Sequence, residues 1–320
     1  MTRIGYTLMT EQSGPRELVS YAAKAEQAGF DFEVSSDHFF PWLDAQGHAC
    51  YAWAMLGAAT QVTERVELMT YVTCPTMRYH PAVVAQKAAT LQLLSRGRFL
   101  LGLGSGENLN EHVVGRGWPP VDVRHDMLAE AIDIIGALFD GGYVRHRGEH
   151  FQVDSAKLWD LPEPRVPIGV AVSGAQSVSR FAPMADHMIA VEPQRDLVTA
   201  WDDAGDSSAR KIGQLPVSWD TDEERAVQRA HQQFRWFGGG WKVNAELPGT
   251  SAFAGATQFV TPDDVAASIP CGPDLDKIAA AVKEFTDAGF TDVAVVQIGD
   301  EAQDEFLDVA AKDLLPLLRG

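Results

Sequence analysis

The feature that most constrains the fold is a regular alternation of short apolar runs with segments of helical periodicity. Apolar runs typical of β-strands occupy residues 4–9, 30–35, 66–72, 99–103, 168–172, 187–191, 212–218 and 293–298. Between them apolar residues recur at helical spacing, as Leu18, Tyr21 and Ala25 do. No Pro- or Ser-rich linker divides the 320 residues. The pattern predicts one domain over residues 1–320, an α/β fold of the (β/α)₈ (TIM) barrel type with insertions, rather than a doubly wound sheet.

The same helix-to-strand junction occurs near both ends of the chain. An Ala-Gly-Phe triplet surrounds Gly29 and recurs around Gly289, each time between a helical pattern and an apolar run. Glycine directly after a periodic segment is a helix stop signal. The recurrence supports a repeated βα unit.

Three irregular segments interrupt the alternation, at residues 106–123, 140–165 and 235–270. Loops that follow barrel strands build the active site of such folds, so we expect substrate and cofactor there. Residues 234–241, rich in glycine and aromatic residues, are a candidate wall or lid of the pocket. The alternative is a hydrophobic patch at a subunit interface.

The charge and the cysteines exclude several classes of function. With a formal net charge of -18 and a pI of about 4.8, the surface should repel nucleic acid and anionic membranes. The three cysteines are far apart and form no cluster with metal-ligand spacing, so we expect neither disulfides nor a metal site. No signal peptide and no membrane-spanning apolar run is recognisable. We expect a cytoplasmic enzyme acting on a small molecule.

Candidate chemistry gathers where the predicted strands end. Asp37 and His38 follow the second strand, and Trp42 comes four residues later. An imidazole beside a carboxylate and an aromatic wall suits proton transfer near neutral pH. Taken alone, the segment is explained equally well as a turn whose aromatic side chains fill a core edge.

A glycine run follows the fourth strand. From Gly102 to Gly106 it has the pattern G-x-G-x-G rather than G-x-G-x-x-G, which argues against a dinucleotide site. Such glycines let the backbone approach a flat ring closely. Glu107 would then be a carboxyl group in an apolar pocket, where its pKa rises and it can donate a proton. The alternative is that Glu107 only caps the following turn.

Four motifs at these strand ends together resemble one family. They are Glu11-Gln12, Ser36-Asp37-His38-Phe39 with Pro41-Trp42, Pro75-Thr76 with Arg78-Tyr79 and Pro81-Ala82, and Gly106-Glu107 with Leu109-Asn110-Glu111. In this order they are similar to the luciferase-like, coenzyme F420-dependent oxidoreductases, in the branch of the F420-dependent glucose-6-phosphate dehydrogenases and their relatives. The resemblance is close over about residues 3–190 and looser beyond. It implies a (β/α)₈ barrel, usually a homodimer, that holds F420 in the barrel mouth.

The resemblance also implies roles for single residues. His38 would accept a hydroxyl proton, Trp42 would stabilise the developing charge, and Glu107 would protonate the cofactor ring. The positions that match cofactor contacts are Asp37, Tyr71, Val72, Cys74, Asn110, Val172, Ser173, Gly174 and Ala175. The bond between Tyr71 and Val72 matches a non-proline cis peptide behind the ring. Residues 171–175 match the loop that holds the cofactor phosphate.

The positions matched to the substrate site depart from the sugar-phosphate enzymes of this branch. The predicted substrate residues are Glu11, Val191 and Gln194. Val191 and Gln194 stand where those enzymes have a threonine and a lysine, and Ala267 replaces a later lysine. Arg195 is one position away and could restore one contact. A phosphate is held by charge-assisted hydrogen bonds, so the sequence favours a neutral alcohol, a ketone or an activated alkene over glucose 6-phosphate.

Two other functions stay open at this point. One is an FMN-dependent luciferase-like monooxygenase on the same barrel, and the other is a cofactor-binding barrel without turnover. An oxygenase has less use for two proton-transfer groups beside the ring, and a protein without turnover has no use for them. The pair formed by His38 and Glu107 therefore favours an F420-dependent oxidoreductase that moves a hydride between C5 of the deazaflavin and a small organic substrate.

Overall fold

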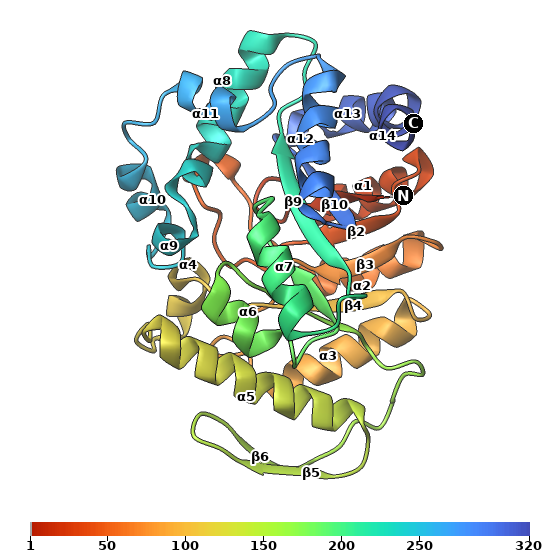
Figure 1. Ribbon diagram of the computed structural model, residues 1–320, viewed down its shortest axis with the longest axis vertical. Helices are drawn as coiled ribbons and strands as arrows, with labels where there is room; N and C mark the ends of the chain where they lie inside the picture. The colour runs from red at the N-terminus through yellow and green to blue at the C-terminus, as the bar shows by residue number, and fades with distance from the viewer. Residues whose placement is uncertain (1) are drawn as a thin grey trace.

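The computed structural model describes residues 2–320 and confirms the predicted barrel (Figure 1). Within these residues parallel strands close into a barrel in the order β1-β10-β9-β8-β7-β4-β3-β2. The barrel strands are β1 (Arg3–Leu8), β2 (Phe32–Ser35), β3 (Glu67–Thr70), β4 (Phe99–Leu103), β7 (Ile168–Ala171), β8 (His187–Ile189), β9 (Lys211–Val217) and β10 (Asp292–Gln297). The first and last strands are neighbours, with Arg3 opposite Asp292, and this pairing closes the barrel.

Helices surround the barrel and connect its strands. The longer ones are α1 (Pro15–Ala28), α2 (Ala52–Val62), α3 (Pro81–Leu94), α5 (Val121–Phe139), α6 (Ala175–Phe181), α7 (Arg195–Ala204), α8 (Glu223–Phe234) and α12 (Leu275–Ala288), followed by α13 (Gln303–Val309) and α14 (Leu315–Arg319). Across residues 2–320, no helix is long and apolar enough to cross a membrane.

The two Ala-Gly-Phe junctions have the same conformation. Gly29 and Gly289 lie just past the ends of α1 and α12 with φ angles of 103° and 104°, in the left-handed region that glycine adopts without strain. The next amides, those of Phe30 and Phe290, donate to carbonyls five residues back. This is the Schellman pattern, which satisfies the last carbonyls of a helix and turns the chain into the next strand.

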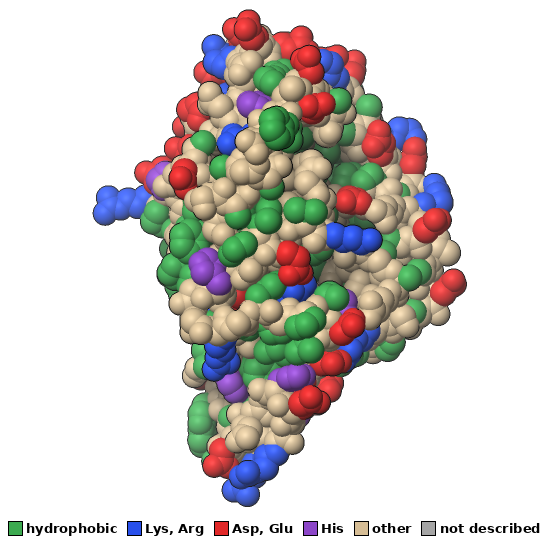
Figure 2. Space-filling model, turned by 90° about the vertical axis from the view of Figure 1, so that its left-hand side faces the viewer, with side chains coloured by type: hydrophobic (Ala, Val, Ile, Leu, Met, Phe, Trp, Pro, Cys, Tyr) green, Lys and Arg blue, Asp and Glu red, His purple; other side chains and the backbone are tan. Residues whose placement is uncertain are grey.

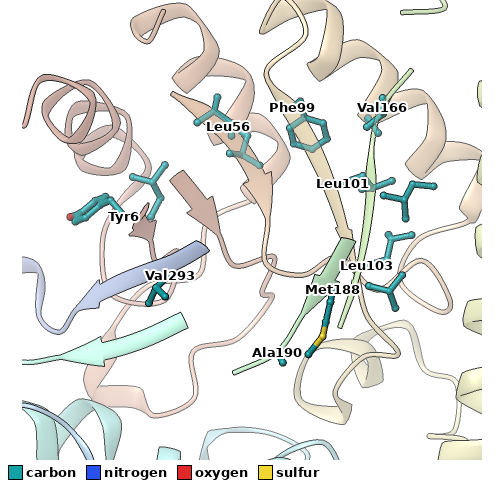
Figure 3. Close-up of a cluster of buried hydrophobic side chains, with 14 of the residues drawn as sticks. Tyr6, Leu56, Phe99, Leu101, Leu103, Val166, Met188, Ala190 and Val293 are labelled. Atoms are coloured by element: carbon teal, nitrogen blue, oxygen red, sulfur yellow. The ribbon is translucent and has the colours of Figure 1, made fainter. Parts of the chain in front are cut away.

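Two apolar layers hold the barrel. Inside it, side chains such as Phe32, Met69 and Ile212 fill the centre, as is usual for eight-stranded barrels. Gly5 makes room for this filling, because a Cβ there would lie 2.5 Å from the Phe32 ring. The second layer lies between strands and helices, where Figure 3 shows Leu101 among its members.

The predicted irregular segments contain regular structure that the sequence analysis missed. β5 (Val144–Arg147) and β6 (Gln152–Ala156) form an antiparallel hairpin outside the barrel, below α5 in Figure 1. Glu130 of α5 holds the hairpin, because its carboxylate contacts His146 at 2.9 Å and accepts from two backbone amides. Hairpin strands of this length carry too little alternation to be recognised from one sequence.

Other boundaries also differ from the prediction. α5 begins at residue 121, inside the segment predicted as irregular over residues 106–123. Near the C-terminus the helical segment is divided into α13, a π turn at Ala310–Leu314, and α14. The segment predicted as irregular over residues 235–270 contains α9 (Trp241–Asn244), α10 (Thr250–Ala256) and α11 (Pro262–Ser268). The short α4 (Asn108–Glu111) follows β4.

We call residues 235–256 the cap. They begin with a 3₁₀ turn at Arg235–Gly239 and continue through α9 and α10. Trp236 and Phe253 of the cap belong to one apolar cluster with Trp42, Met9 and Val296, which lie at strand ends. This cluster fixes the cap over the carboxyl ends of the strands.

Candidate active site

A cavity of about 550 Å³ lies at the carboxyl ends of the strands, beneath the cap. Every barrel strand contributes a lining residue, from the middle of β9 and from the last positions of the other strands or just beyond: Thr7, Ser36, Tyr71, Gly104, Ala171, Ala190, Gln214 and Val296. Trp236, Phe237 and Trp241 line it from the cap. The prediction that residues 234–241 form a pocket wall is therefore confirmed. Figure 2 looks at the side of the molecule that carries α9 and α10, where apolar side chains are exposed between charged ones.

His38 is held between two carboxylates. Its Nδ1 lies 3.1 Å from the Phe40 carbonyl oxygen and 3.2 Å from Oε1 of Glu11. Its Nε2 lies 3.3 Å from Oε2 of Glu107. Because Nδ1 faces two acceptors, we assign the Nδ1–H tautomer to the neutral ring. Nε2 is then the atom that can exchange a proton with Glu107 or with a ligand.

Burial and charge act in opposite directions on this pair. Burial alone lowers the pKa of His38, but Glu11 and Glu107 favour the imidazolium, and the pKa is raised above its ordinary value. The pKa of Glu107 is raised by burial, although His38 and the Asn110 amide oppose this. The pair therefore holds a proton more tightly than a free imidazole does.

Glu11 is fully buried beneath the imidazole. Its Oε2 accepts hydrogen bonds from the hydroxyl of Thr10, at 3.0 Å, and from that of Ser36. The hydroxyl of Ser36 also accepts from the Thr10 amide at 3.1 Å. Glu11 was predicted to contact substrate, and it does line the cavity, but its carboxylate is directed to His38.

Asp37 follows β2 and lines the cavity, yet its carboxylate is already saturated. Oδ1 accepts from Tyr79 at 3.1 Å and from Arg78 at 3.3 Å, and Oδ2 accepts from Thr73 at 2.8 Å and from Trp53 at 3.0 Å. A carboxylate offers about four lone-pair sites. The side chain therefore fixes the loops around it, and its role as a cofactor ligand stays a prediction.

Arg78 connects Asp37 to a second buried acid. Its Nε lies 3.4 Å from Glu111, which also accepts from the Arg78 amide at 2.7 Å. Burial raises the pKa of Glu111 to about 7 in spite of this ion pair. The "Arg78-Tyr79" and "Asn110-Glu111" motifs thus meet in one network below the cavity.

Trp42 forms an aromatic wall beside the imidazole. Its ring centroid lies 4.9 Å from that of His38. On the cap side it stacks on Trp236, at 4.0 Å and 10°, and meets the edge of Phe253 at 5.1 Å. Trp42 thus lies beside His38, as predicted, and Trp236 belongs to the segment 234–241 that was predicted as a pocket wall.

The predicted cis peptide is present between Tyr71 and Val72. Both residues line the cavity, and the Tyr71 hydroxyl donates to the Ala190 carbonyl at 3.1 Å. Gly104 lies against Val72, where a Cβ would come within 2.5 Å of Val72 Cγ2. Gly106, with φ of 87°, similarly leaves space for the sulfur of Cys74. The glycine run therefore allows Val72 and Cys74 to approach the backbone closely, and its approach to a flat ring stays a prediction.

Asn110 joins the loop after β2 to the acid after β4. Its Oδ1 accepts from the amides of Phe39 and Phe40 at 2.8 and 3.2 Å, and its Nδ2 donates to Glu107 at 2.7 Å. Cys74 and Asn110 both line the cavity, where the resemblance expects cofactor contacts.

The loop after β7 follows the strand that pairs with β4. Val172, Ser173 and Gly174 line the cavity, and the amides of Ser173 and Gly174 lie 3.2 and 3.3 Å from the Ser177 hydroxyl. Ala175 is not among the lining residues, because it is the first residue of α6 and is exposed. Its place in the predicted loop is taken by Ser177, which lines the cavity instead.

The predicted substrate residues after β8 are only partly in place. Val191 lines the cavity, but Gln194 does not and bonds the exposed Glu192 carboxylate instead. Arg195 donates to the Asp287 carbonyl outside the cavity, so it does not replace a lysine there. The reason is that α7 begins at Arg195 and directs this part of the chain away from the mouth. Glu192 lines the cavity and was missed.

Comparisons with known proteins show the family to which this chain belongs. The sequence model of the luciferase-like monooxygenase family matches residues 1–292. An F420-dependent glucose-6-phosphate dehydrogenase of Amycolatopsis mediterranei (strain U-32) is 35% identical, and the alignment covers 100% of this chain and 99% of the relative. One from Beutenbergia cavernae is also 35% identical, over 100% and 98% of the two chains.

Solved structures with the same fold span the whole chain. An F420-dependent secondary alcohol dehydrogenase in complex with an F420-acetone adduct has a TM-score of 0.86 and 29% identity, covering 98% of this chain and 99% of that one. The F420-dependent tetrahydromethanopterin reductase of Methanopyrus kandleri, with a TM-score of 0.79 and 19% identity over 99% of both chains, shares the fold. The barrel, the full-length relatives and the matched family model lead to one conclusion: this chain belongs to the luciferase-like monooxygenase family, among relatives that are F420-dependent dehydrogenases.

Proposed function

We propose that this protein is a coenzyme F420-dependent oxidoreductase that interconverts a neutral alcohol and its ketone. The observation that carries the proposal is the arrangement of Glu11, His38 and Glu107 at one end of the cavity. Full-length relatives that are F420-dependent dehydrogenases support the cofactor, and the alcohol dehydrogenase with its acetone adduct supports the substrate class.

The residues around the cavity fit a flat deazaflavin. Small residues, among them Gly104, Gly106 and Ala171, border the cavity between His38 and the loop at Ser173. A Cβ at Gly104 or Gly106 would collide with its neighbour. The resemblance assigns the ring to Tyr71, Val72, Cys74 and Asn110, and the phosphate to Val172, Ser173 and Gly174. When bound, F420 would supply the hydride acceptor or donor at C5.

His38 would handle the proton that accompanies the hydride. In the oxidation direction an alcohol loses its C–H hydride and its O–H proton, and Nε2 of His38 accepts that proton. Glu11 fixes the ring through Nδ1 and stabilises the imidazolium that forms. Glu107, with its raised pKa, can hold the proton that the reduced cofactor takes up. Trp42 limits the movement of substrate beside the imidazole and keeps water out.

A phosphorylated sugar fits the substrate end poorly. Val191 is apolar, Gln194 and Arg195 lie outside the cavity, and Glu192 adds a carboxylate at its rim. A phosphate next to Val191 would find no cation supplied by residues 191–195 and would face the Glu192 carboxylate. The aromatic wall of Trp42 and Trp236 instead favours an apolar substituent on the alcohol.

The test is a steady-state assay that follows the absorbance of oxidised F420 with 2-propanol, a longer secondary alcohol and glucose 6-phosphate. We expect turnover with a secondary alcohol and a kcat/KM for glucose 6-phosphate well below about 10⁴ M⁻¹s⁻¹, the lower end of the ordinary enzyme range. Efficient turnover of the sugar phosphate would contradict the substrate assignment. Turnover with FMN and oxygen instead of F420 would contradict the cofactor.

A further inference from the structure

Arg124 is a buried cation of the cavity that has no role in the proposed chemistry. It lies in the first turn of α5, its side chain is 3% exposed, and it lines the cavity. Its guanidinium donates to the Pro119 carbonyl at 2.9 Å and lies 4.3 Å from the Trp118 ring. Its Nε, also buried, has no hydrogen-bond partner within residues 2–320. A buried guanidinium with an unused donor is costly unless an acceptor reaches it.

Two further nitrogen groups line the same cavity as this guanidinium. His125 lines the cavity, and its buried Nδ1 has no partner among the described residues. Burial and the neighbouring Arg180 and Arg124 lower the pKa of His125, so the ring is neutral and can donate from one nitrogen. Lys242 lines the cavity from the cap and makes no ion pair with any described residue. His125 packs edge-to-face on Phe181 of α6, the helix that follows the Ser173 loop, at 5.4 Å.

The only carboxylate paired with Arg124 in residues 2–320 comes from the cap. Oε1 of Glu246 lies 2.7 Å from the guanidinium, and Oε2 accepts from the Trp118 indole at 3.0 Å. The Glu246 side chain is 51% exposed, so water screens it and competes for it. Asn108 holds the same cap segment through the carbonyls of Ala245 and Glu246, both at 3.0 Å. The carboxylate can therefore leave Arg124 without release of the cap backbone.

We propose that Arg124, His125 and Lys242 form an anion subsite for a carboxylate or phosphate group of a bound ligand. Glu246 is the internal carboxylate that occupies Arg124 until that ligand binds. In a chain with a net charge of -18, two cations lining one cavity raise the positive potential where an anionic group would otherwise be repelled. The polar contacts of His38 are with Phe40, Glu11 and Glu107 and with none of these three residues, so the subsite is compatible with a neutral reacting group at His38.

The anionic group has two sources that share this chemistry. It belongs either to the acidic tail of the cofactor or to a separate anion such as an acidic substrate. The first assignment rests on the proposed function. The probes that separate them are F420, the same deazaflavin without phosphate and glutamates, and inorganic phosphate. Affinity for each deazaflavin is measured by fluorescence titration, and affinity for phosphate by isothermal calorimetry.

The variants are Arg124→Gln, Glu246→Gln and the control Arg165→Gln, which breaks the exposed ion pair with Asp186 outside this cavity. If the cofactor supplies the anion, Arg124→Gln raises the Kd for F420 at least about tenfold and leaves that for the truncated deazaflavin unchanged. Glu246→Gln lowers the Kd for F420, because the competing carboxylate is gone. If a separate anion is the ligand, Arg124→Gln raises the Kd for inorganic phosphate and Glu246→Gln lowers it, and the Kd for F420 does not change in either variant.

If all three variants bind F420 and phosphate with the same Kd values as wild type, the subsite is overturned and the proposed function is left intact. Weaker binding in both Arg124→Gln and Glu246→Gln would also overturn it, since the ion pair would then only support the fold. Glu246→Gln keeps the test decisive if Arg124→Gln does not fold. A wild-type protein that binds phosphate in this way but not F420 would support the subsite and contradict the proposed function.

Discussion

A histidine fixed between two carboxylates differs from the free imidazole that a sequence motif suggests. Asp37-His38 alone indicates an Asp–His pair, but the structure pairs His38 with Glu11 and Glu107, and gives the Asp37 carboxylate to four other donors. Nδ1 is committed to fixed acceptors, which leaves Nε2 as the atom for exchange. The proposed proton-transfer group is therefore a cluster of His38, Glu11 and Glu107 whose titrations are coupled, rather than a single residue.

Replacing the imidazole should remove proton transfer without removing the pocket. His38→Ala should lower kcat by about 10²–10⁴-fold, the usual contribution of a general acid or base, with near-normal F420 affinity. His48→Ala is the matched control, since His48 is exposed and does not line the cavity. A kcat in His38→Ala above about a third of wild type, where at least ~10²-fold loss is expected, would make His38 a structural residue.

The same cluster predicts opposite pH dependences for the two directions. Oxidation needs His38 without its proton, and its pKa is raised, so kcat/KM for an alcohol should rise with pH through an apparent pKa above the ordinary 6.5 of histidine. Reduction needs the protonated imidazole, so kcat/KM for a ketone should fall with pH over the same range. Glu11→Gln removes a carboxylate that raises this pKa, and the oxidation profile should shift to lower pH. Identical profiles in wild type and Glu11→Gln would show that Glu11 does not act on His38.

Glu33 on β2 makes stability depend on pH away from the active site. Its carboxyl is fully buried, its two oxygens lack partners within residues 2–320, and burial raises its pKa well above the ordinary value. The folded state therefore needs the neutral acid. Its contribution is present below the unfolded pKa and is lost as pH rises toward the folded one. In wild type this loss lowers the unfolding free energy as pH rises. The decline should be smaller in Glu33→Gln, as measured by urea titration from pH 5 to 9.

The comparison for this stability prediction is the exposed Glu64, which lies near the end of α2. Glu64→Gln should leave the pH dependence of the unfolding free energy as it is in wild type. A Glu33→Gln profile parallel to that of wild type would mean that Glu33 ionises in the folded state.

At the scale of elements, sequence signals worked where one residue type alone suits a conformation. Gly29 and Gly289 end their helices as predicted, because a left-handed residue after a helix favours glycine. The hairpin of β5 and β6 and the helices α9 and α10 gave no such signal. Their segments are held by tertiary contacts, such as Glu130 with the hairpin and Trp236 on Trp42, which no local pattern contains.

The two helix ends allow a prediction with an internal control. Gly29→Ala should destabilise the protein by about 1 kcal/mol, because a Cβ is strained at a φ of 103°. A Cβ at Gly29 would touch nothing closer than 3.7 Å, so the cost comes from the backbone. Gly136→Ala, in the interior of α5 with open space around it, should instead stabilise by about 0.5–1 kcal/mol. Chemical denaturation measures the unfolding free energy of both variants. A change of the same sign in Gly29→Ala and Gly136→Ala would contradict the capping role of Gly29.

At the scale of the whole molecule, the barrel and the place of the cavity at its strand ends were predictable, and the full set of lining residues was not. Alternating patterns determine how many strands there are, and parallel βα units have few ways to close. The cavity depends on which strand-end side chains meet across the barrel. Val191 lines it but Gln194 does not, because a helix begins directly after them. A single domain over residues 1–320 and a homodimer stay predictions, and sedimentation equilibrium would test the latter.

The measurement that tests the cofactor most directly is an equilibrium fluorescence titration of the protein with F420 and with FMN under identical conditions. Saturable binding of F420 with little affinity for FMN is expected, because the cavity combines the His38–Glu107 pair with a border of small residues beside the Tyr71–Val72 peptide. Tighter binding of FMN than of F420 would contradict an F420-dependent oxidoreductase and favour a flavin monooxygenase.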